Sequence, residues 1–315
     1  MASGREKPTA WGAYHPSRRM AVVFGVLASI LWGASFVGAK VALRDFSPIA
    51  LLVFRYGIAL IIMAPIVHWL EGIRLPNRRQ LPALLLLGAL GVSLNQLLQS
   101  FGMLWTSASQ ASWLTAVAPV MIAVMGWIFL REGHAKRQIL GLALSMAGAV
   151  LISYEPNPNP AQAASRWGPV LILLAALAWA GFTVLGKRLV ISLLPLNMTT
   201  IALFLGWFLI LPAFIGTDAW QGLDQVSMQG WLAVLFLAVA CTVGAYTLYF
   251  LALRGAETAL VAVVQYLEPI TTMVLAAFIL QERLTWMSLL GGALILMGVV
   301  LVERANVRTL KIPVA

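Results

Sequence analysis

The sequence predicts an all-α integral membrane protein in which ten transmembrane helices form two inverted five-helix repeats. The first supporting observation is composition: 61% of the 315 residues are hydrophobic and only 10% are charged, whereas soluble domains carry about 25% charged residues. The second observation is a series of ten long apolar segments along the chain. The third is a set of residues that recurs in the same order in both halves of the sequence.

The ten apolar segments are long enough, or nearly so, to cross a bilayer as helices. Helices satisfy their own backbone hydrogen bonds in lipid, and the sequence lacks the ten-residue alternating segments typical of membrane barrels. The fifth and tenth segments are short, so we expect them to tilt little or to lie partly at the interface. The predicted spans are residues 20–39, 48–68, 82–102, 111–130, 138–154, 168–187, 196–215, 231–251, 259–280 and 286–302.

The duplication is visible as eight pairs of identical residues that keep their order along the chain. Four pairs are separated by 147 positions and four by 150, so a three-residue insertion between Pro212 and Trp231 reconciles the two spacings. Eight ordered matches indicate a repeated unit, where a single match would mean little. The pairs are Trp32/Trp179, Lys40/Lys187, Pro48/Pro195, Pro65/Pro212, Pro119/Pro269, Glu132/Glu282, Gly141/Gly291 and Gly148/Gly298.

Each copy of the repeat has five predicted spans, and this odd number places the second copy upside down relative to the first. Inverted repeats are typical of secondary transporters, whose substrate site lies near the middle of the membrane between the two halves. The predicted organisation is an N-terminal tail at 1–19, a first repeat at 20–154, a Pro-rich linker at 155–167, a second repeat at 168–303 and a C-terminal tail at 304–315.

The basic residues predict the orientation of the chain. With the N-terminus in the cytoplasm, 16 Lys and Arg residues fall in cytoplasmic segments and 4 in outer segments, while Arg55 lies within a span. This distribution follows the positive-inside rule. Both tails are therefore expected in the cytoplasm and the Pro-rich linker on the outer side.

Several function classes are disfavoured by the same sequence. The net charge is +10, but the basic residues lie between apolar runs, so we expect no nucleic-acid partner. The single Cys241 allows no internal disulfide and disfavours a thiol metal site. Catalysis needs mutually placed acids, bases or nucleophiles, and Glu268 stands alone within the spans. We therefore expect no enzyme activity, no metal and no cofactor.

The motifs also carry a family resemblance over nearly the whole chain, from about residue 20 to 302. The first copy contains LWGASFVGAKVAL, SPIALLVFRYG, TSASQASWLTAVAPVM and FLREG, and the second contains YFLALRGAETALVAVVQYLEPITTMVLAAFILQERLTW. In order and duplication, the chain resembles the EamA-type branch of the drug/metabolite transporter superfamily. The resemblance implies a bacterial inner-membrane carrier, often an exporter of amino acids or other metabolites.

Glu268 and Pro269 stand in the middle of the ninth span, where a carboxyl group and a helix breaker are both costly. A charge at the bilayer centre costs about 2.5–3.5 kcal/mol, so Glu268 should face protein or water and is a candidate for coupling transport to protons. The alternative is a neutral or ion-paired Glu268 that braces the bend. Pro119 matches Pro269, and both prolines are expected either to line the site or to bend their helices for packing.

Amide and phenol side chains predict a binding site near the middle of the membrane. Asn95 and Gln99 lie four residues apart on the third span and should point inward, because amides facing lipid are costly. Tyr246 and Tyr249 occupy the positions of the eighth span that match Gln96 and Gln99. Aromatic faces with a few polar groups suit a small organic ligand. The alternative is that these side chains only join helices by hydrogen bonds.

Trp32 and Trp179 are repeat partners near the middle of the first and sixth spans, away from the ends where interfacial tryptophans gather. They are expected to line the site, with core packing as the alternative. Gln265 shares a helical face with Glu268 and completes the predicted substrate-binding set. Trp113 is nearer the end of its span and is expected in the interfacial belt.

Arg55 lies seven residues into the second span, and Ala202 matches it in the second copy. The resemblance also places an arginine here in the first copy. We expect Arg55 to extend toward the outer surface. The alternatives are that it gates the outer mouth or binds a carboxylate of the substrate. Lys40 is expected to be an orientation anchor, and Glu282 a helix cap or a partner in a loop ion pair.

Two glycine pairs predict close helix packing. Gly141 and Gly148 lie seven residues apart on the fifth span, and Gly291 and Gly298 have the same spacing on the tenth. Glycines at helix interfaces permit close approach of two backbones. The expectation is packing within each copy or a homodimer face, so the protein is expected to be a monomer or a homodimer.

Together these features predict an alternating-access carrier for a small molecule, with export of amino acids or related metabolites implied by the resemblance. One alternative is an efflux carrier for lipophilic cations that uses Glu268, which the absence of any acid from the first span disfavours. Another is a facilitative carrier of a different metabolite. A channel is disfavoured because a selectivity filter needs a ring of charges or carbonyls.

Overall fold

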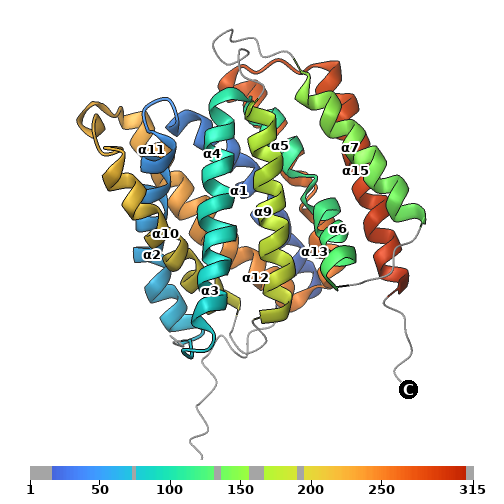
Figure 1. The fold of residues 1–315 in the computed structure, drawn as a ribbon, viewed down its shortest axis with the longest axis horizontal. Helices are drawn as coiled ribbons and strands as arrows, with labels where there is room; N and C mark the ends of the chain where they lie inside the picture. Colours follow the sequence, from blue (N-terminus) through green and yellow to red (C-terminus); the bar gives the residue numbers. More distant parts are fainter. Residues whose placement is uncertain (1–15, 73–75, 131–135, 156–166, 190–194, 310–315) are drawn as a thin grey trace, which may run out of the picture.

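The computed structural model describes residues 16–72, 76–130, 136–155, 167–189 and 195–309. Within these ranges the regular structure is entirely helical, and it forms ten helical segments in the predicted places (Figure 1). Seven segments are long and apolar enough to span a membrane, while 267–280 and 286–302 are shorter apolar helices. The predicted Pro-rich linker and the predicted N-terminal tail lie largely outside the described residues. The first half of the predicted C-terminal tail, 304–309, continues the last helix, and the rest lies outside the described residues.

The first repeat contains α1 (Arg18–Ala42), α2 (Pro48–Leu70), a third segment of α3 (Leu81–Leu87), η1 (Gly88–Leu94) and α4 (Asn95–Trp105), a fourth of α5 (Ala108–Thr115) and α6 (Ala118–Leu130), and α7 (Lys136–Ser153). The second contains α9 (Trp167–Leu189), α10 (Pro195–Gly216), a segment of α11 (Met228–Phe236), η3 (Leu237–Gly244) and α12 (Ala245–Gly255), a segment of α13 (Thr258–Val264), α14 (Leu267–Leu275) and η4 (Ala276–Leu280), and α15 (Trp286–Thr309). A short 3-10 turn, η2 (Leu223–Gln225), precedes α11.

Serine residues define the starts of several helices. The side chains of Ser17, Ser47, Ser107 and Ser227 each accept a hydrogen bond from the backbone N–H three residues later. Such N-caps satisfy one of the backbone donors that the first helical turn leaves free. In α2 the cap is followed directly by Pro48, which is compatible with the first helical position because its missing N–H is not needed there.

The irregularities of the helices follow the repeat. The third and eighth segments each contain a π-helical stretch, η1 and η3, at corresponding places. The fourth and ninth segments are each interrupted, after Thr115 and after Val264, one turn before Pro119 and Pro269. A proline removes a backbone hydrogen bond to the carbonyl one turn earlier, which explains why both interruptions precede the prolines. The two prolines therefore do break their helices.

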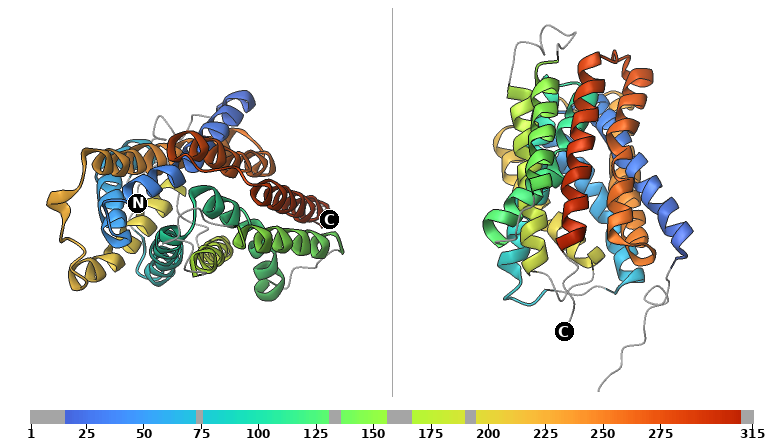
Figure 2. Two further views of the ribbon diagram at one scale, coloured as in Figure 1. Left: turned by 90° about the horizontal axis from the view of Figure 1, so that it is seen from above. Right: turned by 90° about the vertical axis from the view of Figure 1, so that its right-hand side faces the viewer.

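The packing of the helices is also pseudo-symmetric. Helix α1 packs against α12 and α14, and its repeat partner α9 packs against α4 and α6. Helices α2 and α10 pack against each other. At one edge of the bundle, α7 and α15 lie side by side along their length (Figures 1 and 2).

The glycine pairs join the two copies, which corrects the expectation of packing within each copy or in a homodimer. A Cβ atom added at Gly298 would lie 2.3 Å from the carbonyl oxygen of Gly141, and one added at Gly148 would lie 2.5 Å from that of Gly291. Only glycine permits such an approach, so α7 and α15 form one close-packed pair. Trp113 is also buried, with 3% of its surface exposed, and packs against Gly292 rather than in an interfacial belt.

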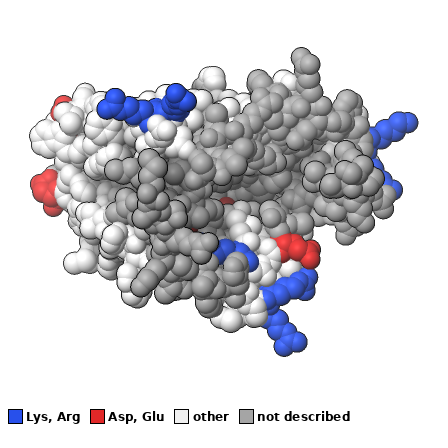
Figure 3. Space-filling model, turned by 90° about the horizontal axis from the view of Figure 1, so that it is seen from below, with Lys and Arg blue, Asp and Glu red and all other residues white. Residues whose placement is uncertain are grey.

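Helix α1 begins, and α15 ends, on one side of the bundle, which we call the terminal side (Figure 2). Exposed basic residues gather there, several of them visible at the rim in Figure 3. On the opposite side, the basic residues of the described ranges are Lys40, Arg44 and Arg283. The basic residues that the structure describes on the terminal side are Arg18, Arg19, Arg78, Arg79, Lys136, Arg137 and Arg254.

Candidate functional site

Three aromatic side chains of the predicted set meet at the crossing of α1 and α12. The ring of Trp32 lies 5.6 Å from that of Tyr246, nearly perpendicular at 74°, and 5.2 Å from that of Tyr249. Phe250 adds a ring 5.6 Å from Tyr249. Edge-to-face and tilted arrangements of this kind are favourable for aromatic rings. The sequence placed Trp32, Tyr246 and Tyr249 in one site, and the structure brings them into contact.

Trp179 has a different environment from its repeat partner. Its ring stacks on Phe182 of the same helix, with centroids 5.0 Å apart and planes at 28°. Phe182 in turn packs closely over Gly91 in η1. The second copy therefore contributes a partly buried tryptophan from α9, but this tryptophan contacts a phenylalanine where Trp32 contacts two tyrosines.

The amide side chains of α4 form a connected network. Asn95 is 3% exposed and donates through Nδ2 to the carbonyl oxygen of Ala175 in α9, at 2.8 Å. Gln96 donates to Asn95 Oδ1 at 2.8 Å and to Gln99 Oε1 at 3.4 Å. The sequence predicted that Asn95 and Gln99 point inward. It did not identify Gln96 as the residue that links them, because position 96 lies 100° away from 95 on a helix.

Arg55 points into this network, which corrects the expectation that it extends to the outer surface. Its Nε donates to Thr242 Oγ1 at 3.1 Å and its Nη1 donates to Gln96 Oε1 at 3.4 Å. The guanidinium carbon lies 5.3 Å from the ring centre of Tyr56. Thr242 lies in η3, and π-helical turns of this kind occur frequently at functional sites.

The break in the ninth segment lies directly against α1. Thr272 Oγ1 lies 2.8 Å from the carbonyl oxygen of Gly33 and 3.0 Å from that of Glu268, and donates its hydrogen between them. A Cβ atom at Gly33 would lie 2.5 Å from the Glu268 carbonyl oxygen, so α1 can approach the bend only at a glycine. Gln265, at the break itself, hydrogen-bonds the side chain of Tyr249. These contacts place Gln265 and the Glu268 backbone beside the aromatic cluster.

The Glu268 carboxyl is partly buried and interacts electrostatically with Tyr246. Among the residues that the structure describes, no Lys, Arg or His lies within ion-pair distance of it. An ion-paired Glu268 that braces the bend, one of the predicted alternatives, therefore has no cationic partner in those ranges. The same ranges contain no group of three His, Cys, Asp or Glu side chains that could hold a metal ion.

On the opposite side, two charged residues hold the corner between the third and fourth segments. Lys40 Nζ donates to the carbonyl oxygens of Met103 and Thr106, at 2.5 and 2.6 Å. The Glu282 carboxylate accepts from the backbone N–H of Ala108 at 2.7 Å, and from the N–H and hydroxyl of Ser109 at 3.1 and 2.7 Å. A cation on free carbonyls and an anion on free N–H groups both complement the backbone dipoles of helix ends.

Glu282 is thus a helix cap, as one of the two sequence-based expectations had it. Lys40 does more than the expected anchor, because it joins α1 to the end of α4. Helix α1 also meets the ninth segment at Gly33. On the opposite side of the bundle, the contacts of Lys40 and Glu282 therefore join helices that lie next to the aromatic cluster.

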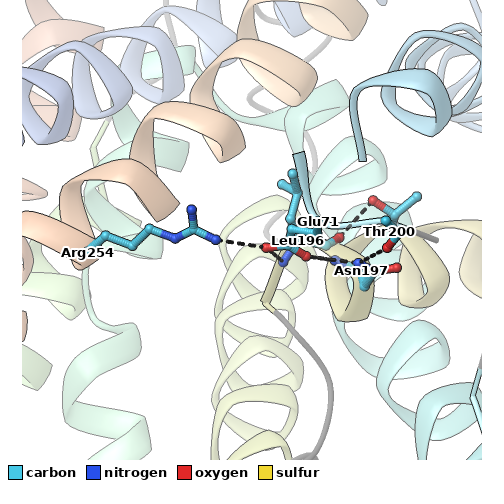
Figure 4. A network of polar contacts seen from close by, with 6 residues as sticks. Glu71, Leu196, Asn197, Thr200 and Arg254 are labelled. Atoms are coloured by element: carbon cyan, nitrogen blue, oxygen red, sulfur yellow. Dashed lines mark hydrogen bonds and ion pairs between the residues drawn. The ribbon is translucent and has the colours of Figure 1, made fainter. Parts of the chain in front are cut away.

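On the terminal side, a second polar network joins α2, α10 and α12 (Figure 4). Glu71, only 6% exposed, accepts from the backbone N–H of Asn197 at 2.9 Å and from its Nδ2 at 3.0 Å. Arg254 forms an ion pair with Glu71 at 3.3 Å. A cavity of about 20 Å³ lies beside this pair and is bounded by Phe250. A volume of this size holds about one water molecule. Phe250, which borders the cavity, is also in contact with Tyr249 of the aromatic cluster.

The sequence analysis missed Glu71 and Arg254. Each lies at the end of an apolar span, where charged residues are common and have no special role by default. A larger cavity of about 410 Å³ lies on the opposite side, between the α1–α2 turn and the segment that follows α10. Its lining includes Asp45, Ser47 and Asp218, and it is separate from the aromatic cluster.

Ten helical segments, seven of them long and apolar enough to cross a membrane, with an aromatic cluster and polar networks between them, are typical of a multi-pass membrane transporter. The chain belongs to the EamA-like transporter family, whose model matches residues 19–154 and 166–304. The two matches correspond to the two halves of the chain, which confirms the family resemblance found in the sequence.

Relatives along nearly the full length carry transporter names. An uncharacterized transporter of Archaeoglobus fulgidus is 29% identical over 87% of this chain and 94% of its own length. A protein of Streptantibioticus cattleyicolor named "Probable terminal-alkyne amino-acid exporter" is 28% identical, covering 89% and 92%. One of Escherichia coli named "Probable amino-acid metabolite efflux pump" is 27% identical, covering 88% and 92%. A crystal structure with 17% identity shares the fold, with a TM-score of 0.62 over 94% of this chain and all of that one.

Proposed function

We propose that this transporter exports amino acids or related small metabolites by alternating access through a site between the two repeats. The observation that carries the proposal is the contact of Trp32 with Tyr246 and Tyr249, beside Gln265. The amide network of α4 connects to this cluster through Arg55, which donates to Gln96 and interacts electrostatically with Tyr246. Aromatic walls with a few fixed hydrogen-bonding groups suit a small, partly apolar ligand. The two relatives named as amino-acid exporters support the substrate class.

Two polar networks, one on each side of the bundle, support alternating access as the mechanism. Alternating access requires that a site be sealed on one side while the other opens. Lys40 and Glu282 join helices on the opposite side of the site, and Glu71 and Arg254 join helices on the terminal side. The network on the opposite side consists of hydrogen bonds, and the network on the terminal side consists of hydrogen bonds and one ion pair. We expect these contacts to be exchanged for water as the halves move. Both proline breaks, at Pro119 and Pro269, lie in helices that border the site.

Glu268 is the residue that we assign to coupling. It lies in the first turn of α14, directly after the helix break, and interacts electrostatically with Tyr246. It has no cationic partner in the described ranges. Intramembrane carboxyl groups of this kind mark ion and proton pathways. We place both termini in the cytoplasm of the producing cell, on the basis of the basic residues on the terminal side.

Counterflow in proteoliposomes tests the substrate class. Vesicles that contain the purified protein are loaded with single unlabelled neutral amino acids, and uptake of the labelled compound is followed without an ion gradient. Neutral amino acids are expected to exchange, and Gln99→Ala and Tyr249→Ala are expected to lower the exchange at least tenfold. Unchanged exchange in both variants would place the site elsewhere.

The second candidate is efflux of lipophilic cations, which Glu268 favours because a membrane-embedded carboxylate can neutralise a cation. The same vesicles test it with labelled tetraphenylphosphonium. Exchange of this cation, without exchange of any amino acid, would replace the amino-acid proposal with the efflux of cations. In that event Glu268 becomes the residue that binds the substrate.

A further inference from the structure

Arg55 is a charged residue in the interior of the bundle whose described contacts are all neutral. Its two hydrogen bonds within the described residues go to a hydroxyl, Thr242 Oγ1, and to an amide oxygen, Gln96 Oε1. The third contact is the ring of Tyr56. The ion pair that the structure records within the described residues joins Glu71 to Arg254, on the terminal side and away from Arg55.

This arrangement leaves a guanidinium group without a counter-ion in its described surroundings. A cation within a membrane protein is costly unless an anion or several dipoles compensate it. Guanidinium carries five N–H donors in a rigid fork, and only two of them have partners in the described residues. The fork is also held in place, because Arg55 donates hydrogen bonds to Thr242 in η3 and to Gln96 in α4. A fixed, incompletely satisfied fork is suited to binding a carboxylate through two parallel hydrogen bonds.

The position of Arg55 connects this fork to the aromatic cluster. Tyr246, which contacts Trp32, interacts electrostatically with both Arg55 and Glu268. Gln96, which accepts from Arg55, belongs to the same amide network as Gln99. The guanidinium therefore faces the same central site as the residues assigned to substrate binding.

The scaffold itself does not require a charge at this position. The corresponding residue of the second copy is Ala202, which is 2% exposed and packs among Leu84 and Leu87. A residue needed only to hold the fold would be expected in both copies, because the helices pack in corresponding ways. Arg55 therefore serves a role that belongs to one half of the molecule.

We propose that Arg55 binds the carboxylate group of the substrate, so that the transporter selects carboxylate-containing small metabolites over their neutral analogues. The inference rests on the proposed function and sharpens it, because it names the group of an amino acid that the site recognises. The neutral side of the site, with Trp32 and Tyr249, then receives the apolar part of the substrate. Arginine is chosen over lysine because only its planar fork matches both carboxylate oxygens.

The test compares acids with their amides. Unlabelled L-leucine, L-phenylalanine, L-leucinamide and L-phenylalaninamide compete with a labelled neutral amino acid in counterflow. In the wild-type protein each acid is expected to compete at least tenfold better than its amide. In Arg55→Gln this ratio is expected to fall to within about twofold, through weaker competition by the acid alone, since a tenfold preference corresponds to one strong polar contact. Arg55→Lys is expected to give an intermediate ratio.

The control variant is Arg44→Gln, which removes the same charge from an exposed position. It is expected to keep the wild-type ratio. An unchanged ratio in Arg55→Gln, or an equal loss for acid and amide, would overturn the inference. The thermal midpoint of ligand-free Arg55→Gln distinguishes a binding role from a structural one. If Arg55 binds substrate, the variant keeps a midpoint at or above the wild-type value. If Arg55 only stabilises the fold, the midpoint falls and competition by both the acid and the amide weakens.

Failure of the proposed function gives a different result. If no amino acid exchanges in wild-type vesicles, benzoate and benzamide are titrated against the tryptophan fluorescence of the purified protein. Saturable quenching by benzoate, lost in Arg55→Gln, would support a carboxylate site in a transporter of other substrates. Equal quenching by both compounds, or none by benzoate, would overturn the role of Arg55.

Discussion

The two halves of this protein share a backbone plan but differ in the polar groups at its centre. Both contain a π-helical stretch in the third helix and a break one turn before a proline in the fourth. The residue before Pro119 is Ala118, whereas the residue before Pro269 is Glu268. The duplicated scaffold therefore supplies two matched sets of interrupted helices, and single differences between the copies change the chemical groups that they carry.

The aromatic and amide groups divide in the same way. The first copy contributes Gln96 and Gln99 from α4, and the second contributes Tyr246 and Tyr249 at the matching positions of α12. A substrate between the halves would therefore meet hydrogen-bonding groups on one side and phenol rings on the other. The shared backbone plan therefore determines where these side chains lie, whereas the differences between the copies determine which chemical groups lie there.

The junctions between α2 and α10 show a third difference. On the terminal side, the end of α2 caps the start of α10 through Glu71. On the opposite side, the start of α2 and the segment that follows α10 border the 410 Å³ cavity, whose lining includes Ser47 and Asp218. One junction is sealed by hydrogen bonds and an ion pair and the other borders a cavity, so the two junctions are not equivalent.

Disruption of the glycine contact between α7 and α15, which joins the two halves, is expected to have the largest effect on stability. In Gly298→Ala the new methyl group would meet the Gly141 carbonyl and Ser145 at 2.3 Å, so α7 and α15 must separate. We expect a loss of about 3 kcal/mol in the free energy of unfolding, measured as a lower thermal midpoint in detergent. Gly216→Ala is the matched control, because no heavy atom lies within 4 Å of its added Cβ. Equal midpoints for the two variants would contradict the close packing of α7 and α15.

The second prediction concerns Glu268, a carboxyl group that only the second copy has before its proline. Glu268→Gln keeps the shape of the side chain and removes its ability to ionise. We expect uptake driven by a pH gradient to fall at least tenfold, equivalent to about 1.4 kcal/mol, while counterflow without a gradient changes less than threefold. The double variant Ala118→Glu/Glu268→Gln moves the carboxyl to the matching position and is expected not to restore coupling. Full pH-driven uptake in Glu268→Gln would exclude Glu268 as the coupling residue.

Weakening the junction between α2 and α10 at Glu71 is expected to have the smallest effect of the three changes. Glu71→Gln leaves Arg254 without its ion pair and weakens the cap on α10. We expect a loss of about 1 kcal/mol in the free energy of unfolding, together with faster labelling of Thr247→Cys, a position beside the pair, by a water-soluble maleimide. Asp45→Asn makes the same chemical change at an exposed cap of α11 and is expected to stay within about 0.5 kcal/mol of the wild-type value. If both variants behaved alike, burial of Glu71 would have no energetic role.

Much of the fold is readable from the sequence. Long apolar segments must be helices in lipid, so composition alone fixes their number and approximate bounds. Matched residues such as Pro119 and Pro269 reveal the duplication, and the odd number of spans requires the inversion. Trp32, Tyr246 and Tyr249 were identified because polar and aromatic residues in the middle of a span are costly or conspicuous, and they do meet.

The tertiary structure alone decided which side chains face one another. Hydropathy says nothing about which helix lies beside which, so the glycine pairs were predicted to pack within each copy or in a homodimer and Arg55 was predicted to extend to the surface. The same limit hid Glu71 and Arg254, because a charge at the end of a span looks the same whether water or another helix covers it. Composition and period determined the helices and their repeat, since both depend on local chemistry. Packing determined the site, since a contact between residues 187 positions apart, such as that of Arg55 with Thr242, exists only after the helices assemble.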